Sequence, residues 1–176
     1  MDKKVTFQHY GISLWEIEVI FETLQRSFEV EEKQLQPDDP QYVSMIEIGF
    51  PVAYGEAFFQ SFTMNSWDKI KGVIKDMKRR RGRKGVKALI RFAGFGGGKT
   101  GDLVFPLLTK GDRQFEMGLE KIEYLVDVVP IQLKSAPPKT DEIWYSYDEA
   151  SFKWNPSVAK SDDINYLYKN GEWKSK

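Results

Sequence analysis

Apolar residues spaced three and four positions apart predict a long amphipathic helix near the start of the chain. The residues that share this face are Leu14, Ile17, Phe21, Leu24 and Phe28. Ser13 precedes them and Glu16 follows three positions later, the spacing of a capping box. The pattern therefore predicts a helix from Leu14 to about Glu32, followed by a turn at Pro37.

Two further segments show the helical period. The apolar positions of the second segment, which Asn65 or Ser66 caps, are Trp67, Ile70, Ile74 and Met77. Those of the third, which Asp112 caps, are Phe115, Leu119, Ile122 and Val126. The second segment ends in the cationic run 78–81 and then Gly82, which suits the negative end of a helix dipole and a left-handed terminal residue.

Alternating apolar and polar residues, rich in β-formers, predict strands between these helices. The predicted strands are Lys4–Tyr10, Tyr42–Phe50, Glu56–Met64, Val86–Ala93, Asp102–Leu108, Val128–Leu133 and Glu142–Tyr147. Pro106 removes one ladder donor, so its strand is expected at an edge or a bulge. Asn170-Gly171 predicts a type I′ hairpin near the end of the chain.

The element order from Glu56 to Leu133 is then β-α-β-β-α-β. This order predicts an α+β, ferredoxin-like fold, in which an antiparallel sheet carries two helices on one face and the crossovers are right-handed. The expected organisation is an N-terminal helix and strand extension (1–55), the βαββαβ core (56–134) and an aromatic-rich β extension (135–176), packed as a single compact domain.

The amino-acid composition excludes several kinds of functional site. The 176 residues are 41% hydrophobic and include no cysteine, which excludes disulfides, thiolate nucleophiles and zinc sites of the cysteine type. The start of the sequence lacks the apolar stretch of a signal peptide, and no run is long enough to span a membrane, so a cytoplasmic protein is expected. His9 is the only histidine, and no carboxylate grouping suggests a metal site, so neither a catalytic residue nor a metal ligand is predicted.

Charge is unevenly distributed although the formal net charge is zero. Residues 1–64 contain 4 Lys and Arg against 11 Asp and Glu, residues 65–113 contain 14 against 4, and residues 114–176 contain 8 against 11. The acidic flanks either neutralise the basic middle internally or leave a positive face for an anionic partner.

The basic run and a neighbouring glycine-rich loop form the candidate binding site for nucleic acid or another polyanion. The predicted site residues are Lys75, Lys78, Arg79, Arg80, Arg81, Arg83, Lys84, Lys87, Gly96, Gly97, Gly98 and Lys99. Arginine side chains suit phosphate oxygens, and each neutralised phosphate releases counterions. The first hypothesis is therefore a non-enzymatic polyanion-binding protein.

Two alternatives remain open. Residues 93–100, AGFGGGKT, are one substitution from a P-loop, but a β-like run with Pro106 follows instead of a helix. A phosphate- or nucleotide-binding enzyme would use Lys99 and Thr100, although no cofactor is predicted. The other alternative is a protein-interaction module, such as a regulator, inhibitor or immunity-type protein, that docks a partner through Trp144, Tyr145 and Trp154.

Overall fold

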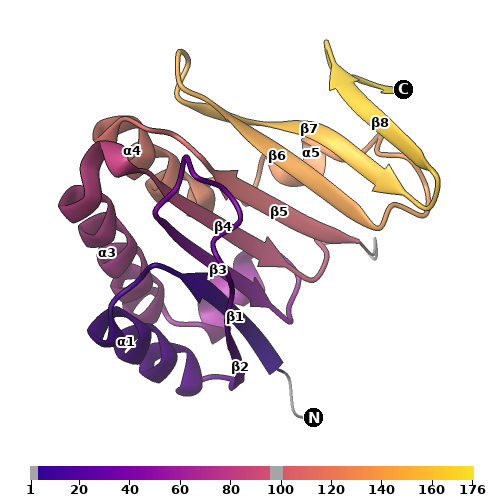
Figure 1. Cartoon of the computed structure of the whole chain (residues 1–176). Coiled ribbons are helices and arrows are strands. Elements are labelled where there is room, and N and C mark those ends of the chain that lie inside the picture. Colours follow the sequence, from indigo (N-terminus) through magenta and orange to yellow (C-terminus); the bar gives the residue numbers. More distant parts are fainter. Residues whose placement is uncertain (1–3, 96–100) are drawn as a thin grey trace.

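The strands form one mixed sheet (Figure 1). The computed structural model describes residues 4–95 and 101–176, and nine strands in these residues pair in the order β2-β1-β3-β4-β5-β6-β7-β8-β9. The strands are β1 (Lys4–Tyr10), β2 (Glu29–Gln34), β3 (Ser44–Phe50), β4 (Val86–Phe92), β5 (Asp102–Leu107), β6 (Glu142–Asp148), β7 (Lys153–Ser161), β8 (Ile164–Lys169) and β9 (Glu172–Ser175). The helices are α1 (Leu14–Gln25), α2 (Glu56–Ser61), α3 (Met64–Arg81), α4 (Asp112–Lys121) and α5 (Val129–Gln132), with 3-10 turns η1 (Gly82–Lys84) and η2 (Ile122–Leu125).

The ferredoxin-like prediction is wrong. Three parallel pairs, β1/β2, β3/β4 and β5/β6, are each joined by a helical crossover, and the pairs meet in antiparallel contacts at β1/β3 and β4/β5. Strands β6 to β9 then continue the sheet as an antiparallel meander. Strands β1 to β6 thus belong to three β-α-β units side by side, and the antiparallel core predicted for residues 56–134 is replaced by parallel pairs.

Three predicted segments adopt a different structure. Residues 56–64 were expected to be a strand but form α2 and the start of α3, because Phe58 and Phe62 are buried one helical turn apart. Residues 128–133 form α5 for the same reason, with Val129 and Leu133 buried. The first helix ends at Gln25, and the segment predicted as its last turns includes the first residues of the parallel edge strand β2.

Local signals predicted other elements well. Ser13 and Glu16 form the capping box, in which the Ser13 hydroxyl accepts from the Glu16 N–H at 3.2 Å. Asn170 and Gly171 both have positive φ, 52° and 79°, as a type I′ turn requires. Pro106 was expected at an edge or a bulge but lies in β5 inside the sheet; its missing donor is tolerated because the pairing of β5 with β6 covers 102–104 and stops before it.

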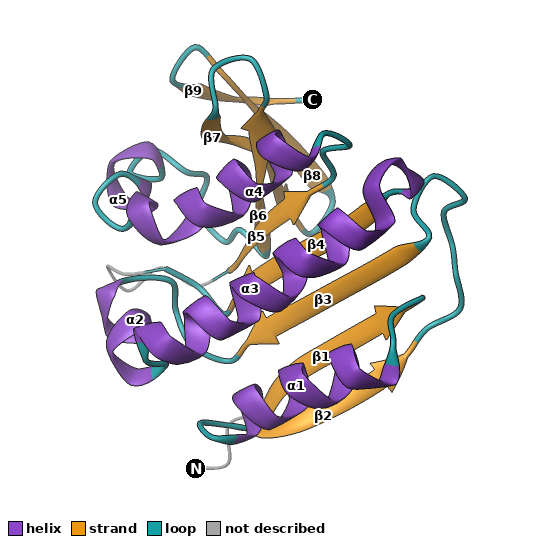
Figure 2. Cartoon of the chain, turned by 90° about the vertical axis from the view of Figure 1, so that its left-hand side faces the viewer, coloured by secondary structure: helices purple, strands orange, loops and turns teal. Residues whose placement is uncertain are grey.

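The crossover from β5 to β6 has the opposite hand to the other two. Figure 2 shows the helices on one face of the sheet, with the usual right hand for β1-α1-β2 and β3-α3-β4. In the sheet, β4 lies on the same side of β3 as β6 lies of β5. However, β5 and β6 run antiparallel to β3 and β4. With the helices on the same face, the third crossover is therefore left-handed, a rare arrangement. A right-handed connection would place α4 on the other face, away from α3.

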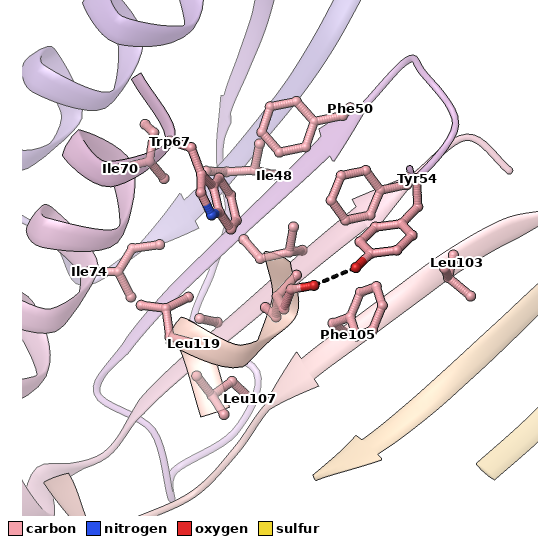
Figure 3. Close-up of a cluster of buried hydrophobic side chains, with 14 of the residues drawn as sticks. Ile48, Phe50, Tyr54, Trp67, Ile70, Ile74, Leu103, Phe105, Leu107 and Leu119 are labelled. Atoms are coloured by element: carbon pink, nitrogen blue, oxygen red, sulfur yellow. Dashed lines mark hydrogen bonds between the residues drawn. The ribbon is translucent and has the colours of Figure 1, made fainter. Parts of the chain in front are cut away.

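The core lies between the sheet and the helices (Figure 3). Ile48 of β3, Ile74 of α3 and Leu119 of α4 are all fully buried there. Tyr54 contributes a polar contact, since its hydroxyl donates to the Ile122 carbonyl oxygen at 2.5 Å. Burial raises the pKa of Tyr54 well above its ordinary value, so the hydroxyl stays a donor. This bond ties the loop after β3 to η2.

Replacing Tyr54 with Phe should lower the free energy of unfolding by about 1 kcal/mol, because the buried Ile122 carbonyl loses its donor while the ring packing is kept. Urea denaturation of the two proteins measures the difference. Tyr124→Phe is the matched control, because the Tyr124 side chain is exposed and is expected to leave stability unchanged. Equal midpoints for wild type and Tyr54→Phe would contradict the assigned bond.

Candidate functional site

The structure places the predicted basic residues along one helix and the strand that follows it. Five of them lie on α3, Arg83 and Lys84 lie on η1, and Lys87 lies on β4. Thr63 caps the start of α3, and its hydroxyl accepts from the Ser66 N–H at 3.3 Å; the cap was predicted two or three residues later, at Asn65 or Ser66. Gly96, Gly97, Gly98 and Lys99 lie outside the described residues, as does Thr100.

Carboxylates from α4 and η2 lie against the basic side of α3. Arg79 Nε donates to Glu116 Oε1 at 2.7 Å, and Lys75 forms an ion pair with Glu120. Lys71, which the sequence analysis did not select, is almost fully buried and forms ion pairs with Glu120 and Glu123. The left-handed crossover therefore positions α4 where its acidic side chains neutralise α3.

Glu16 neutralises the end of α3 from the other side. Its carboxylate is fully buried and accepts from Arg81 at 2.7 and 2.9 Å and from Arg80 at 3.3 Å. Burial alone would raise the pKa of Glu16, but hydrogen bonds from Arg81 and Ser13 outweigh it and hold the pKa below its ordinary value. One residue thus caps α1 and joins α1 to α3.

Lys78 is a core residue and is not available to a ligand. Its side chain is fully buried, and Nζ donates to the carbonyl oxygens of Gly82 and Lys110, both at 2.7 Å. Asp112 Oδ1 lies 3.1 Å from the same nitrogen. These three partners match the three N–H groups of an ammonium. The lysine therefore joins the end of α3 to the start of α4.

Two of the eight basic candidates are both exposed and without an ion pair among the described residues, Arg83 and Lys84. Lys87 is paired with Asp38 at 3.4 Å and lies over the Tyr42 ring at 5.7 Å. The acidic flanks thus neutralise most of the basic run internally, one of the two arrangements that the charge distribution allows. Arg83 borders a hollow of about 620 Å³ between η1 and the start of α4.

The aromatic residues proposed for a protein partner are mostly inside the molecule. Tyr145 and Trp154 are buried, and Trp144 is half-buried with Lys160 Nζ 4.6 Å from its ring centroid. The Tyr145 hydroxyl donates to Gln132 Oε1 at 2.8 Å, and Trp154 Nε1 donates to the Gly118 carbonyl oxygen at 2.8 Å. These side chains build the fold around α4 and α5.

An exposed apolar surface lies where the sequence analysis predicted a helix end and a strand. Tyr124 of η2, Val128 at the N-cap of α5 and Ile131 of α5 have 74%, 40% and 76% of their areas exposed. Beside them is a hollow of about 630 Å³, lined by Lys121, Tyr124, Leu125, Val128, Gln132, Phe152, Lys153, Trp154 and Asn155. We call this hollow together with Ile131 the α5 groove. One feature of the sequence could have indicated this surface: residues 122–133, IEYLVDVVPIQL, include more apolar side chains than one buried face can hold.

The walls of the α5 groove are fixed by contacts behind them. Gly118 allows α4 to approach β5 closely, because a Cβ there would lie 2.7 Å from Leu107 Cδ1. Trp154 Nε1 donates to the Gly118 carbonyl oxygen, and Lys121 Nζ donates to the Phe152 carbonyl oxygen. The two bonds hold the β6–β7 turn against α4. The groove is therefore largely preformed, a property that reduces the entropy lost on binding.

No protein-family model, curated protein or solved structure matches this chain. The function must accordingly be inferred from the surfaces themselves.

In residues 4–95 and 101–176, no group of three or more His, Asp or Glu side chains is arranged to hold a metal ion. His9 is buried and hydrogen-bonded to Glu32. None of the described helices is long and apolar enough to cross a membrane.

Proposed function

We propose that this protein is a protein-interaction module that binds its partner through the α5 groove. The observation that carries the proposal is the row of exposed apolar side chains at Tyr124, Val128 and Ile131 beside a preformed hollow. Singly exposed apolar residues are ordinary on protein surfaces, whereas a contiguous apolar patch marks a binding surface. Tyr124 lines this hollow, and tyrosine is one of the residue types that dominate binding energy at protein interfaces.

Site-specific crosslinking tests this function. A photoreactive phenylalanine analogue replaces Ile131 in the full chain, expressed in its source cells, and the same analogue replaces Val43 in a matched control. Val43 is also an exposed apolar residue, but it lies in the loop before β3. A protein adduct at position 131 that is absent at position 43 is expected. No adduct at position 131, or the same adducts at both positions, would overturn the proposal.

A polyanion is the second candidate, and its binding site would be Arg83 and Lys84 beside the hollow of about 620 Å³. A single-stranded oligothymidine should then bind at low salt and weaken as salt rises. The double substitution Arg83→Ala and Lys84→Ala should reduce its affinity more than Arg79→Ala does, since Arg79 is already paired with Glu116. Fluorescence anisotropy of the labelled oligothymidine measures its affinity for the wild type, the double variant and Arg79→Ala. Binding that is undetectable, or unchanged in the double variant, would exclude this candidate.

A further inference from the structure

A second exposed apolar patch lies at the start of α1. Leu14 and Trp15 have 70% and 55% of their areas exposed. Glu18 and Glu22 follow Trp15 at three and seven positions, on the same side of the helix, and both are exposed. We call these four residues the α1 patch. Neither glutamate forms an ion pair among the described residues. Arg80 also lies near Trp15, but its charge is directed to Glu16 and Asp76.

The α5 groove has the opposite charge at its rim. Lys121 and Lys153 are the charged residues among the described side chains that line it. The adjoining hollow, which shares Lys121 and Tyr124, adds Arg113. Lys153 and Arg113 are exposed and form no ion pair within the described part of the chain. The other charged groups of that hollow, Lys75, Glu116 and Glu120, are already paired.

The two surfaces are therefore complementary in both polarity and charge. One presents apolar side chains beside unpaired carboxylates, and the other presents an apolar hollow beside unpaired cations. In Figure 2, α1 and α5 lie at opposite ends of the helical layer, so the two surfaces of one molecule cannot meet. Because the formal net charge is zero, long-range repulsion does not oppose contact between two copies.

We propose that the α5 groove receives the α1 patch of a second copy of this chain. The inference rests on the proposed function and names the partner of the same groove. Trp15 is the anchor that enters the groove, while Glu18 and Glu22 face Arg113 and Lys153. The contact is heterologous, because each copy contributes a different surface to it.

Sedimentation equilibrium of the full chain tests this proposal. The mean mass should rise between about 1 µM and about 500 µM protein, with a weak Kd that increases with salt. Trp15→Ala and Ile131→Asp should each raise Kd at least about tenfold, the loss of about 1.4 kcal/mol. Val43→Asp is the control and should leave Kd unchanged, since Val43 belongs to neither surface.

A charge exchange between copies makes the test specific for the assigned contact. The variant Glu18→Lys with Glu22→Lys and the variant Arg113→Glu with Lys153→Glu should each stay monomeric alone. An equimolar mixture should associate, because the basic patch of one then fits the acidic groove of the other. All four residues are exposed and unpaired among the described residues, so the fold is retained.

A wild-type chain that remains monomeric at the highest concentration would overturn the self-association, and so would a mixture that fails to associate. A crosslinked adduct at position 131 with a different protein, combined with a monomeric chain, would overturn this inference while leaving the interaction function in place. No adduct of any kind would instead remove the function itself.

Discussion

Replacing Lys78 with Ala is expected to lower the free energy of unfolding by about 3 kcal/mol, because two carbonyl oxygens lose the donor that faces them and a cavity is left in the core. The ammonium of Lys78 is fully buried, and its removal leaves the carbonyl oxygens of Gly82 and Lys110 and the carboxylate of Asp112 without their donor. It also opens a cavity next to Phe115, whose ring centroid lies 5.8 Å from Nζ.

Urea denaturation at neutral pH measures this loss. Lys84→Ala is the matched control, because Lys84 is an exposed lysine six residues further along and should change stability by less than about 0.5 kcal/mol. Lys78→Met separates charge from volume, since it refills the space without the donor and should remain less stable than wild type. If Lys78→Ala and Lys84→Ala were equally stable, Lys78 would not hold the junction of α3 and α4.

Replacing Glu16 with Ala is expected to lower the free energy of unfolding by about 3 kcal/mol, because two contributions are lost together. The first is the capping box of α1, in which the Glu16 carboxylate accepts from the Ser13 N–H at 2.7 Å. The second is the junction of α1 with α3, where Arg81 would lose the partner of its mostly buried guanidinium. Glu18→Ala, an exposed neighbour, is the control and should change little.

The Glu16 contribution should also depend on pH. Because the folded pKa of Glu16 is lowered below its unfolded value, its carboxylate stabilises the protein fully above the unfolded pKa, and this stabilisation is lost as pH falls through the folded pKa. The difference in unfolding free energy between wild type and Glu16→Gln should therefore be constant above about pH 5.5 and shrink below about pH 4. A difference that is constant to pH 3 or grows on acidification would contradict the lowered pKa.

Elements set by neighbouring residues could be predicted from the sequence, whereas those set by distant contacts could not. The capping box at Ser13 and the turn at Asn170-Gly171 depend on spacings of a few residues, and both predictions are confirmed. Residues 56–64 and 128–133 are short and rich in β-formers, so their composition favours strands. Packing against the sheet instead selects helices, because it buries side chains four positions apart.

In the candidate site, too, local features could be predicted from the sequence and long-range contacts could not. The basic run was evident in the sequence, but its partners lie far away along the chain: Glu16 is 65 residues from Arg81, and Glu116 is 37 residues from Arg79. No local pattern specifies that α1 and α4 flank α3. The α5 groove was missed because Tyr124 was assigned to the end of a helix and Val128 and Ile131 to a strand, so the three exposed side chains were not expected on one surface.

The left-handed connection between β5 and β6 has a consequence for the order in which the protein folds. A right-handed β-α-β unit follows the natural twist of its own strands, so it can form from local contacts. The third unit has no such preference and gains its geometry from α3, against which α4 docks through Lys71, Lys75 and Arg79. We therefore expect the second unit to act as a template, on which the connection from β5 to β6 takes its hand once α3 is in place.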